Sequence, residues 1–175
     1  ITHKHRILYL EGAITGNVDP HNLLGALDTL SHDPIKLFIT SPGGELDSTF
    51  LFIDTIKMIK SPVYTIGRYC ASAAAIVLAA GQKGEQYLQP HAKVMLHLPA
   101  GQMGGDSKDW DIQHRQMEQY RNTVVDILCE CGVSKTRTEV LADIDRDFWL
   151  NPQEAIEYGL ADKILDTETW GEWIK

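Results

Sequence analysis

The hydrophobic and polar positions along the chain alternate between two periodicities, which predicts an α/β protein. Runs rich in apolar and β-branched residues favour strands at residues 7–14, 35–40, 63–69 and 94–97. Between them, apolar residues at helical spacing predict one helix over residues 19–30, begun by an Asp-Pro pair, and another over residues 46–60. Residues 71–80 are small and apolar all round, which predicts a short buried helix. The repeated order of strand and helix is typical of the α/β class.

The second half of the chain begins with a glycine-rich turn and a long polar helix. Three glycines fall within residues 101–105, so we expect a flexible hinge there. Asp106 or Ser107 can cap the helix that follows, which runs to about Glu130. Its apolar positions form a narrow stripe in a charged background: Ile112, Met117, Tyr120, Val124 and Leu128. Such a helix either lies on the surface of the domain or projects to meet a partner.

Two further helices are expected towards the C-terminal end. One follows Ser134, and the other begins at the sequence Asn-Pro-Gln-Glu of residues 151–154. Here Asn151 is the N-cap, the proline takes the first helical position, and the glutamate can reach back as in a capping box. The 175 residues contain no internal repeat and no long linker, so we expect a single domain spanning residues 1–175.

Composition and charge narrow the classes of function. The chain is 43% hydrophobic and 23% charged, and no apolar run approaches the roughly 18 residues that cross a bilayer. We therefore expect no membrane partner. The formal net charge is −8 and the positive residues are scattered, which disfavours nucleic acid as a partner.

Cys70, Cys129 and Cys131 are sparse and odd in number, which argues against a disulfide framework and for a reducing compartment. Cys129 and Cys131 resemble a metal-binding pair. A structural zinc site needs a second pair of ligands, however, and positions i and i+2 of a helix point apart. We therefore expect no metal site.

Ser72 is a candidate for chemistry because it stands where the predicted strand 63–69 turns into the small-residue helix. Small neighbours leave its hydroxyl accessible, and the free N–H groups of a helix N-terminus can stabilise a developing oxyanion. The alternative is that Ser72 only caps the helix, which is a frequent role for serine.

Two further segments follow predicted strands. The paired glycines of Ser41-Pro42-Gly43-Gly44 allow the backbone to approach a ligand closely, but the segment can equally be an ordinary turn. His97 ends an apolar strand beside the glycine-rich segment, where it can either face a cleft or be a satisfied core residue.

An acidic segment supplies the last candidates. Asp143, Asp145 and Asp147 surround Arg146 just ahead of two aromatic residues. One of these carboxylates can orient a histidine by accepting its ring N–H, which fixes the tautomer and stabilises the imidazolium. The alternative is a solvated surface network. Taken singly, none of these segments identifies a function.

In their order along the chain, however, these segments resemble the proteolytic subunits of the Clp proteases. The resemblance covers about residues 6–165. It rests on Ser-Pro-Gly-Gly at 41–44, Ala-Ser at 71–72, Leu-Ala-Ala-Gly-Gln-Lys-Gly at 78–84, Val-Met-Leu-His-Leu-Pro at 94–99, the acidic segment 143–148, and Glu-Ala-Ile-Glu-Tyr-Gly-Leu-Ala-Asp at 154–162. Chance coincidence of so many ordered motifs is remote.

The resemblance implies a serine endopeptidase that works by acyl transfer. Ser72 matches the family nucleophile, His97 the general base, and Asp147 the acid that orients the histidine. The backbone N–H groups of Gly44 and Ala73 match the two donors of the family's oxyanion hole.

The same resemblance implies a crotonase-like spiral of ββα units, with a head at about residues 1–98 and 145–175 and a projecting handle at about 99–132. In the family, handles interleave two stacked heptameric rings of one or several subunit types, and Asp145 and Arg146 fall where the rings form ion pairs. An AAA+ Clp-type ATPase feeds unfolded polypeptides into the chamber. This chain lacks a Walker-type glycine-lysine motif, so ATP belongs to that partner and no cofactor is expected here. The implied location is the cytoplasm.

The chain also departs from the family pattern. Ala73 stands where methionine is usual, Leu98 where glutamine is usual, residues 66–70 are one residue short, and one residue is added before Asp147. Three alternatives follow. A non-catalytic or partner-activated ring subunit would keep the fold without independent activity. A crotonase-like acyl-CoA enzyme would need a carboxylate acid–base pair. A serine–lysine peptidase would leave the histidine and the aspartate unexplained.

Overall fold

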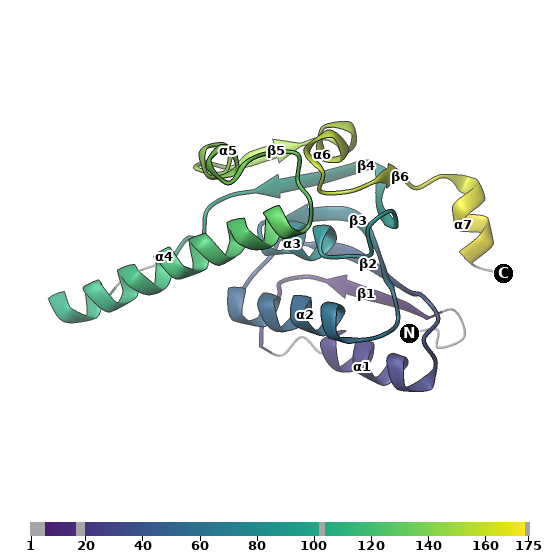
Figure 1. The fold of residues 1–175 in the computed structure, drawn as a ribbon, viewed down its shortest axis with the longest axis horizontal. Coiled ribbons are helices and arrows are strands. Elements are labelled where there is room, and N and C mark those ends of the chain that lie inside the picture. The colour runs from purple at the N-terminus through teal and green to yellow at the C-terminus, as the bar shows by residue number, and fades with distance from the viewer. Residues whose placement is uncertain (1–5, 17–19, 102–103, 174–175) are drawn as a thin grey trace.

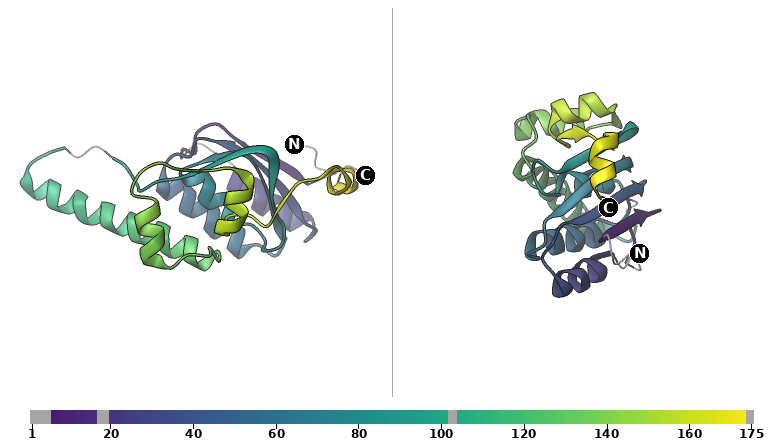
Figure 2. Two further views of the ribbon diagram at one scale, coloured as in Figure 1. Left: turned by 90° about the horizontal axis from the view of Figure 1, so that it is seen from above. Right: turned by 90° about the vertical axis from the view of Figure 1, so that its right-hand side faces the viewer.

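A twisted sheet forms the body of the protein, with most helices on one face and the last helix against the other (Figures 1 and 2). The structure is a computed structural model that describes residues 6–16, 20–101 and 104–173. In chain order the elements are β1 (Ile7–Glu11), α1 (Pro20–Leu30), β2 (Ile35–Ser41), α2 (Leu46–Met58), β3 (Val63–Ala71), α3 (Ala73–Ala79), β4 (Gln86–Leu96), α4 (Ser107–Glu130), α5 (Arg137–Asp143), β5 (Phe148–Leu150), α6 (Pro152–Tyr158), β6 (Lys163–Ile164) and α7 (Thr167–Trp173).

The sheet is mostly parallel. Strands β1, β2, β3 and β4 pair in parallel in that order, β5 runs antiparallel to one end of β4, and β6 pairs in parallel with the other end. The mixture of parallel strands and covering helices confirms the predicted α/β class.

Side chains alternate between the two faces of the sheet along each strand, which gives the protein two apolar layers. In β2, Leu37 and Ile39 belong to the main core beneath the helices, whereas Phe38 points to the opposite face and joins a second, smaller cluster. Successive strand side chains point to opposite faces, so this division follows from the period of two. The aromatic residues Trp170 and Trp173 of α7 pack on the second cluster.

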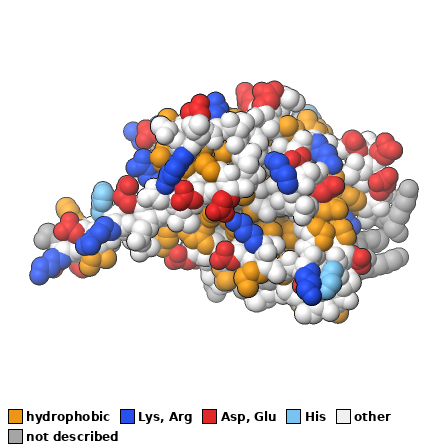
Figure 3. All heavy atoms as spheres, viewed as in Figure 1, with side chains coloured by type: hydrophobic (Ala, Val, Ile, Leu, Met, Phe, Trp, Pro, Cys, Tyr) orange, Lys and Arg blue, Asp and Glu red, His pale blue; other side chains and the backbone are white. Residues whose placement is uncertain are grey.

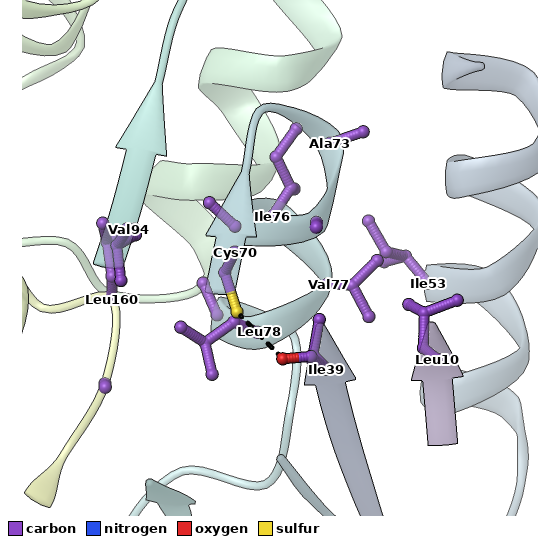
Figure 4. Close-up of a cluster of buried hydrophobic side chains, with 14 of the residues drawn as sticks. Leu10, Ile39, Ile53, Cys70, Ala73, Ile76, Val77, Leu78, Val94 and Leu160 are labelled. Carbon is purple, nitrogen blue, oxygen red and sulfur yellow. Dashed lines mark hydrogen bonds between the residues drawn. The ribbon is translucent and has the colours of Figure 1, made fainter. Parts of the chain in front are cut away.

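All seven residues of helix α3 are buried. Figure 4 shows it between the sheet and α2, with Val77 close to Leu10 and Ile53. Beside it, the sulfur of Cys70 contacts the carbonyl oxygen of Ile39 at 3.8 Å. The predicted short buried helix is therefore confirmed, although it begins two residues later than expected because β3 continues to Ala71.

Two strand boundaries differ from the sequence pattern. Strand β1 ends at Glu11, and Ile14 forms only an isolated bridge to Gly44. Strand β4 begins at Gln86, eight residues before the predicted start at residue 94, because its polar residues still pair with β3. Gln86 pairs with Thr65 of β3, and the nitrogen of its buried side chain donates to the carbonyls of Ala79 and Gly81. The elements β5, β6 and α7 were not predicted, since strands of two or three residues and a helix of seven carry too little periodicity.

Most helix starts follow their local signals. Asp106 is the N-cap of α4, since its carboxylate accepts from the amides of Lys108 and Asp109, and Asn151 caps α6 in a full capping box. Pro20 is the first residue of α1 as predicted. The expected Asp19 cap and part of the expected hinge, residues 102 and 103, lie outside the described residues.

Helix α4 both packs on the body and extends beyond it. Val124 and Leu128 are buried in the main core, whereas Ile112 near the other end is 60% exposed. Figure 1 shows the N-terminal part of the helix extending away from the sheet. The narrow apolar stripe therefore serves as a packing surface only along its C-terminal part.

The surface carries charges of both signs. On the face seen in Figure 3, Lys and Arg side chains are interspersed with Asp and Glu, including along the projecting part of α4. Within residues 6–16, 20–101 and 104–173, every helix is too short or too polar to span a lipid bilayer.

The turn after β2 makes two contacts so close that only glycine fits. A Cβ atom on Gly43, where φ is +91°, would lie 2.6 Å from the carbonyl oxygen of Ala71 and 2.8 Å from the Cβ of Ser72. A Cβ on Gly44 would lie 2.0 Å from the backbone oxygen of Ile14. The paired glycines thus let the turn pack against both the chain around Ser72 and the segment after β1.

A polar network joins α1 to the loop before β3. The Arg6 side chain is buried, and it donates to the carbonyls of Leu27, Ser31 and Asp33 and to the hydroxyl of Ser61. These acceptors satisfy a charge that would otherwise be costly to bury.

The carboxylate of Asp28 completes this network. Although desolvation raises its pKa, hydrogen bonds from the Ser61 hydroxyl and from the Ser61 and Lys60 amides lower the pKa to about 2. Asp28 and Arg6 are thus linked through the hydroxyl of one serine.

We predict opposite effects for two glycine-to-alanine substitutions. Gly43→Ala should lower the free energy of unfolding by more than about 1 kcal/mol, because the new methyl group meets backbone atoms at a positive φ. Gly25→Ala should raise it by about 0.5–1 kcal/mol, because this helical glycine faces open space. Denaturant unfolding measures both, and equal stability of the two variants would contradict the packing of the turn.

We also predict that Asp28 stabilises the fold in a pH-dependent way. Its folded pKa lies below the value of about 4 for an unfolded aspartate, so its contribution is present above pH 4 and is lost as the pH falls towards 2. The difference in melting temperature between wild type and Asp28→Asn should shrink over this range. Asp54→Asn, at an exposed residue of α2, controls for the loss of one charge. A constant difference between pH 5 and pH 2 would contradict the prediction.

Candidate active site

The candidate residues gather at one edge of the sheet, at the carboxyl ends of consecutive parallel strands. The Gly43-Gly44 turn follows β2, Ser72 follows β3 and His97 follows β4. Parallel pairing of Ala71 with Met95 places the ends of β3 and β4 side by side, and the Ser72 amide donates to the Met95 carbonyl at 2.8 Å. Such edges of parallel sheets are where α/β proteins commonly bind ligands.

Ser72 has an unusual backbone conformation, with φ 56° and ψ −127°. A non-glycine residue in such a region costs about 1–3 kcal/mol and persists only where the surrounding structure imposes it. The sharp turn between strand and helix directs the side chain outwards, as at the nucleophile of many hydrolases. Ser72 occupies the N-cap position of α3, yet its side chain makes no capping hydrogen bond. The interpretation of its hydroxyl as a helix cap is therefore wrong.

His97 contacts Ser72 directly. Its Nε2 atom lies 2.8 Å from the Ser72 Oγ, and its side chain is 30% exposed. The interpretation of His97 as a satisfied core residue is therefore also wrong. Just after it, the Leu98 amide donates to the carbonyl of Ile144 at 2.8 Å, which ties the end of β4 to the acidic segment.

Asp147 reaches His97 through the antiparallel pairing of β4 with β5. Leu96 pairs with Phe148, so continuing this register by one residue brings Asp147 opposite His97. Its Oδ1 atom lies 3.3 Å from the His97 Nδ1, and its side chain is 62% exposed. Ser72, His97 and Asp147 thus form a chain of contacts on both nitrogens of one imidazole.

The other charged residues of the acidic segment have different surroundings. Asp143 accepts a hydrogen bond from the hydroxyl of Tyr158 at 3.1 Å. Asp145 and Arg146 are exposed, and within the described part of the chain neither forms an ion pair or a side-chain hydrogen bond. The expected network of three carboxylates around Arg146 therefore does not form within the described residues.

Gly44 and Ala73 line the same pocket as Ser72 and His97. Ala73 is the first residue of α3, where N–H groups have no partner inside the helix and the helix dipole favours negative charge. The two residues predicted to supply amide donors therefore share one pocket with Ser72, and their role in stabilising an oxyanion stays a prediction.

The pocket has a volume of about 530 Å³ and includes residues that the sequence analysis did not assign to the site. Glu45, Asp47, Met117 and Tyr120 line it. Met117 and Tyr120 were recognised only as part of the apolar stripe of α4. Asp47, in the first turn of α2, is typical of an ordinary helix N-terminus. No local signal distinguishes such residues, because α2 and α4 meet only in the folded chain.

Among the described residues, no group of three or more His, Cys, Asp or Glu side chains is placed to hold a metal ion. Cys129 and Cys131 are partly buried near the end of α4, and burial raises the pKa of the Cys131 thiol. In the pocket itself, the contact between the Ser72 hydroxyl and the His97 imidazole is the arrangement found at an activated nucleophile.

Comparison with known proteins identifies relatives of this chain. A family model described as Clp protease matches residues 2–168. The chain is 36% identical over 170 residues to the "ATP-dependent Clp protease proteolytic subunit 4, chloroplastic" of Arabidopsis thaliana, covering 95% of this chain and 58% of that protein. It is 36% identical to a proteolytic subunit 1 of Rhodopirellula baltica, covering 93% of this chain and 73% of that protein.

A proteolytic subunit 2 of Pseudomonas aeruginosa is 35% identical, over 89% of this chain and 80% of that protein. The chain thus spans less than two thirds of the Arabidopsis relative and about three quarters or more of the two bacterial ones. Because the family match extends over nearly the whole sequence, the chain belongs to the Clp protease family.

Proposed function

We propose that this chain is a serine endopeptidase subunit of a self-compartmentalising Clp-type protease. The observation that carries the proposal is the 2.8 Å contact between the Ser72 hydroxyl and the His97 imidazole, at a strained turn that opens into a pocket. Such a pair is the minimal arrangement for an activated nucleophile.

The proposed reaction proceeds in two steps. His97 accepts the proton of Ser72 at Nε2 while the Oγ attacks a peptide carbonyl, and the tetrahedral oxyanion is stabilised by the amides of Gly44 and Ala73. The C–N bond then breaks, and His97 returns the proton to the leaving amine. In the second step His97 removes a proton from water, which hydrolyses the acyl-enzyme and restores the serine.

Asp147 has the role of orienting the imidazole. By accepting the Nδ1–H it holds Nε2 as the proton acceptor and stabilises the imidazolium that forms. Its side chain is largely exposed and lies on the same segment as Asp145 and Arg146, which form no ion pair with any residue that the structure describes. We propose that these two residues pair across the contact between rings, so that assembly orders the segment and brings Asp147 fully onto His97.

The assembly that we propose is a pair of stacked heptameric rings. Residues 1–98 and 145–175 would form the head, and residues 99–132, which include the projecting part of α4, would form a handle between rings. The exposed side chains of Trp110 and Ile112 supply apolar area for this contact. We propose further that a cytoplasmic AAA+ Clp-type ATPase delivers unfolded polypeptides, as the name "ATP-dependent" of the relatives suggests.

One observation favours a second candidate, a ring subunit that is active only with a partner. The distance of 3.3 Å between Asp147 and His97 and the 62% exposure of the Asp147 side chain describe a looser contact than that between His97 and Ser72. Small displacements of catalytic groups reduce rates strongly. Labelling of the nucleophile separates the two candidates.

We predict that a fluorophosphonate probe forms a covalent adduct on Ser72 of the assembled protein. Mass spectrometry of the digested protein should locate the adduct, and the adduct should disappear in Ser72→Ala and His97→Ala but persist in Ser134→Ala, a distant exposed serine. Ser72→Ala should sediment like wild type, since it removes only a hydroxyl.

An adduct on another serine would overturn the assignment of the nucleophile. An assembled protein without any adduct would favour the partner-activated subunit over the independent peptidase.

We predict that Asp147→Asn lowers kcat for peptide hydrolysis by at least about a hundredfold, because the amide can donate to Nδ1 and so favours the wrong tautomer of His97. Its KM and its sedimentation coefficient should stay close to those of wild type. Asp54→Asn is the control for an unrelated change of charge. An unchanged kcat in Asp147→Asn would remove this residue from the reaction.

A further inference from the structure

The pocket beside Ser72 combines an apolar lining with acidic residues. Its apolar side chains come from α3, β4 and α4: Ile76, Met95, Met117 and Val124. The carboxylates of Glu45 and Asp47 line it from the start of α2. Among the described residues that line the pocket, Glu45 and Asp47 are the acidic ones, and none is Lys or Arg. The other titratable lining residues there are His97 and Tyr120. The pocket is therefore both apolar and negatively charged.

Neutral donors hold both carboxylates. The Tyr120 hydroxyl, reaching across from α4, lies 2.9 Å from each carboxylate oxygen of Asp47. Glu45 accepts from the Gly16 amide at 3.0 Å and from the Ser48 hydroxyl at 3.1 Å. Because none of these donors carries a charge, the carboxylates are positioned without being neutralised.

The phenol of Tyr120 remains a donor at neutral pH. Its hydrogen bond to Asp47, followed by desolvation and the Asp47 charge, raises its pKa above the ordinary value. Its ring also packs against Phe50 of α2, with ring centroids 6.1 Å apart. The hydrogen bond from Tyr120 thus ties the exposed Asp47 side chain of α2 to α4.

Building on the proposed peptidase function, we infer that this pocket selects the substrate side chain next to the cleaved bond by its charge. Gly44 and Ala73 line the same pocket, so a carbonyl bound at their amides directs its own side chain into it. A long side chain with an apolar stem and a cationic end fits best, since the stem packs on Met95 and Met117 while the cation meets Asp47. Neutral apolar side chains are accepted, and acidic ones are repelled.

The test uses three peptides that differ only in the residue that supplies the cleaved carbonyl: lysine, leucine or glutamate. With the assembled wild type, kcat/KM should be about tenfold higher for lysine than for glutamate. Asp47→Asn, which keeps an acceptor for Tyr120, should reduce this ratio about threefold or more. Asp54→Asn, on the same helix but outside the pocket, should keep the wild-type ratio.

Binding separates this inference from the proposed function. The same three peptides, labelled with a fluorophore, are titrated into assembled Ser72→Ala, where cleavage plays no part, and into its Asp47→Asn double variant. Tighter binding of the lysine peptide than of the glutamate peptide, reduced by Asp47→Asn, supports the pocket's selectivity even if wild type cleaves nothing. Equal affinities for both peptides, or a ratio that Asp47→Asn leaves unchanged, would overturn it even if wild type is an active peptidase.

Discussion

The candidate site depends on one backbone constraint, the abrupt turn at Ser72 between β3 and α3. The φ of 56° costs about 1–3 kcal/mol, and it is maintained because both flanking elements are fixed. Burial of Ile76, Val77 and Leu78 in α3 contributes about 1.5–3 kcal/mol for each side chain, which exceeds the strain. The turn at Gly43 closes against the same point, so the chain has little freedom to relax there.

Strand pairing then brings the other two groups to the serine. The parallel register of β3 and β4 sets the end of β4 beside Ser72, and the antiparallel register of β4 and β5 sets Asp147 beside His97. The elements that hold His97 and Asp147 in place differ in length and position. His97 is attached to a long central strand, whereas Asp147 precedes a strand of three residues at the sheet edge. Assembly with other subunits is therefore expected to affect the aspartate more than the histidine.

Helix α4 connects the core, the pocket and the projecting end of the molecule. Its C-terminal part packs in the core through Val124 and Leu128, its middle lines the pocket through Met117 and Tyr120, and its N-terminal part extends from the body. In the proposed assembly, a contact at the projecting end would therefore act on the same helix that lines the pocket. The bond from Tyr120 to Asp47 is the point where such movement would alter the charged lining.

The sequence by itself determined the features that depend on local chemistry. These are the α/β class, the proline start of α1, the caps at Asp106 and Asn151, and the buried small-residue helix, each set by hydrogen bonds or burial within a few residues. The resemblance to the Clp proteolytic subunits also named Ser72, His97 and Asp147. Only the tertiary structure decided that the Ser72 side chain meets an imidazole instead of capping a helix, that Asp147 rather than Asp143 lies beside His97, and that Asp47 and Tyr120 share a pocket. The two residues of each pair lie 25, 50 and 73 positions apart in the sequence. Strand register and helix packing bring them together, and a local sequence pattern predicts neither.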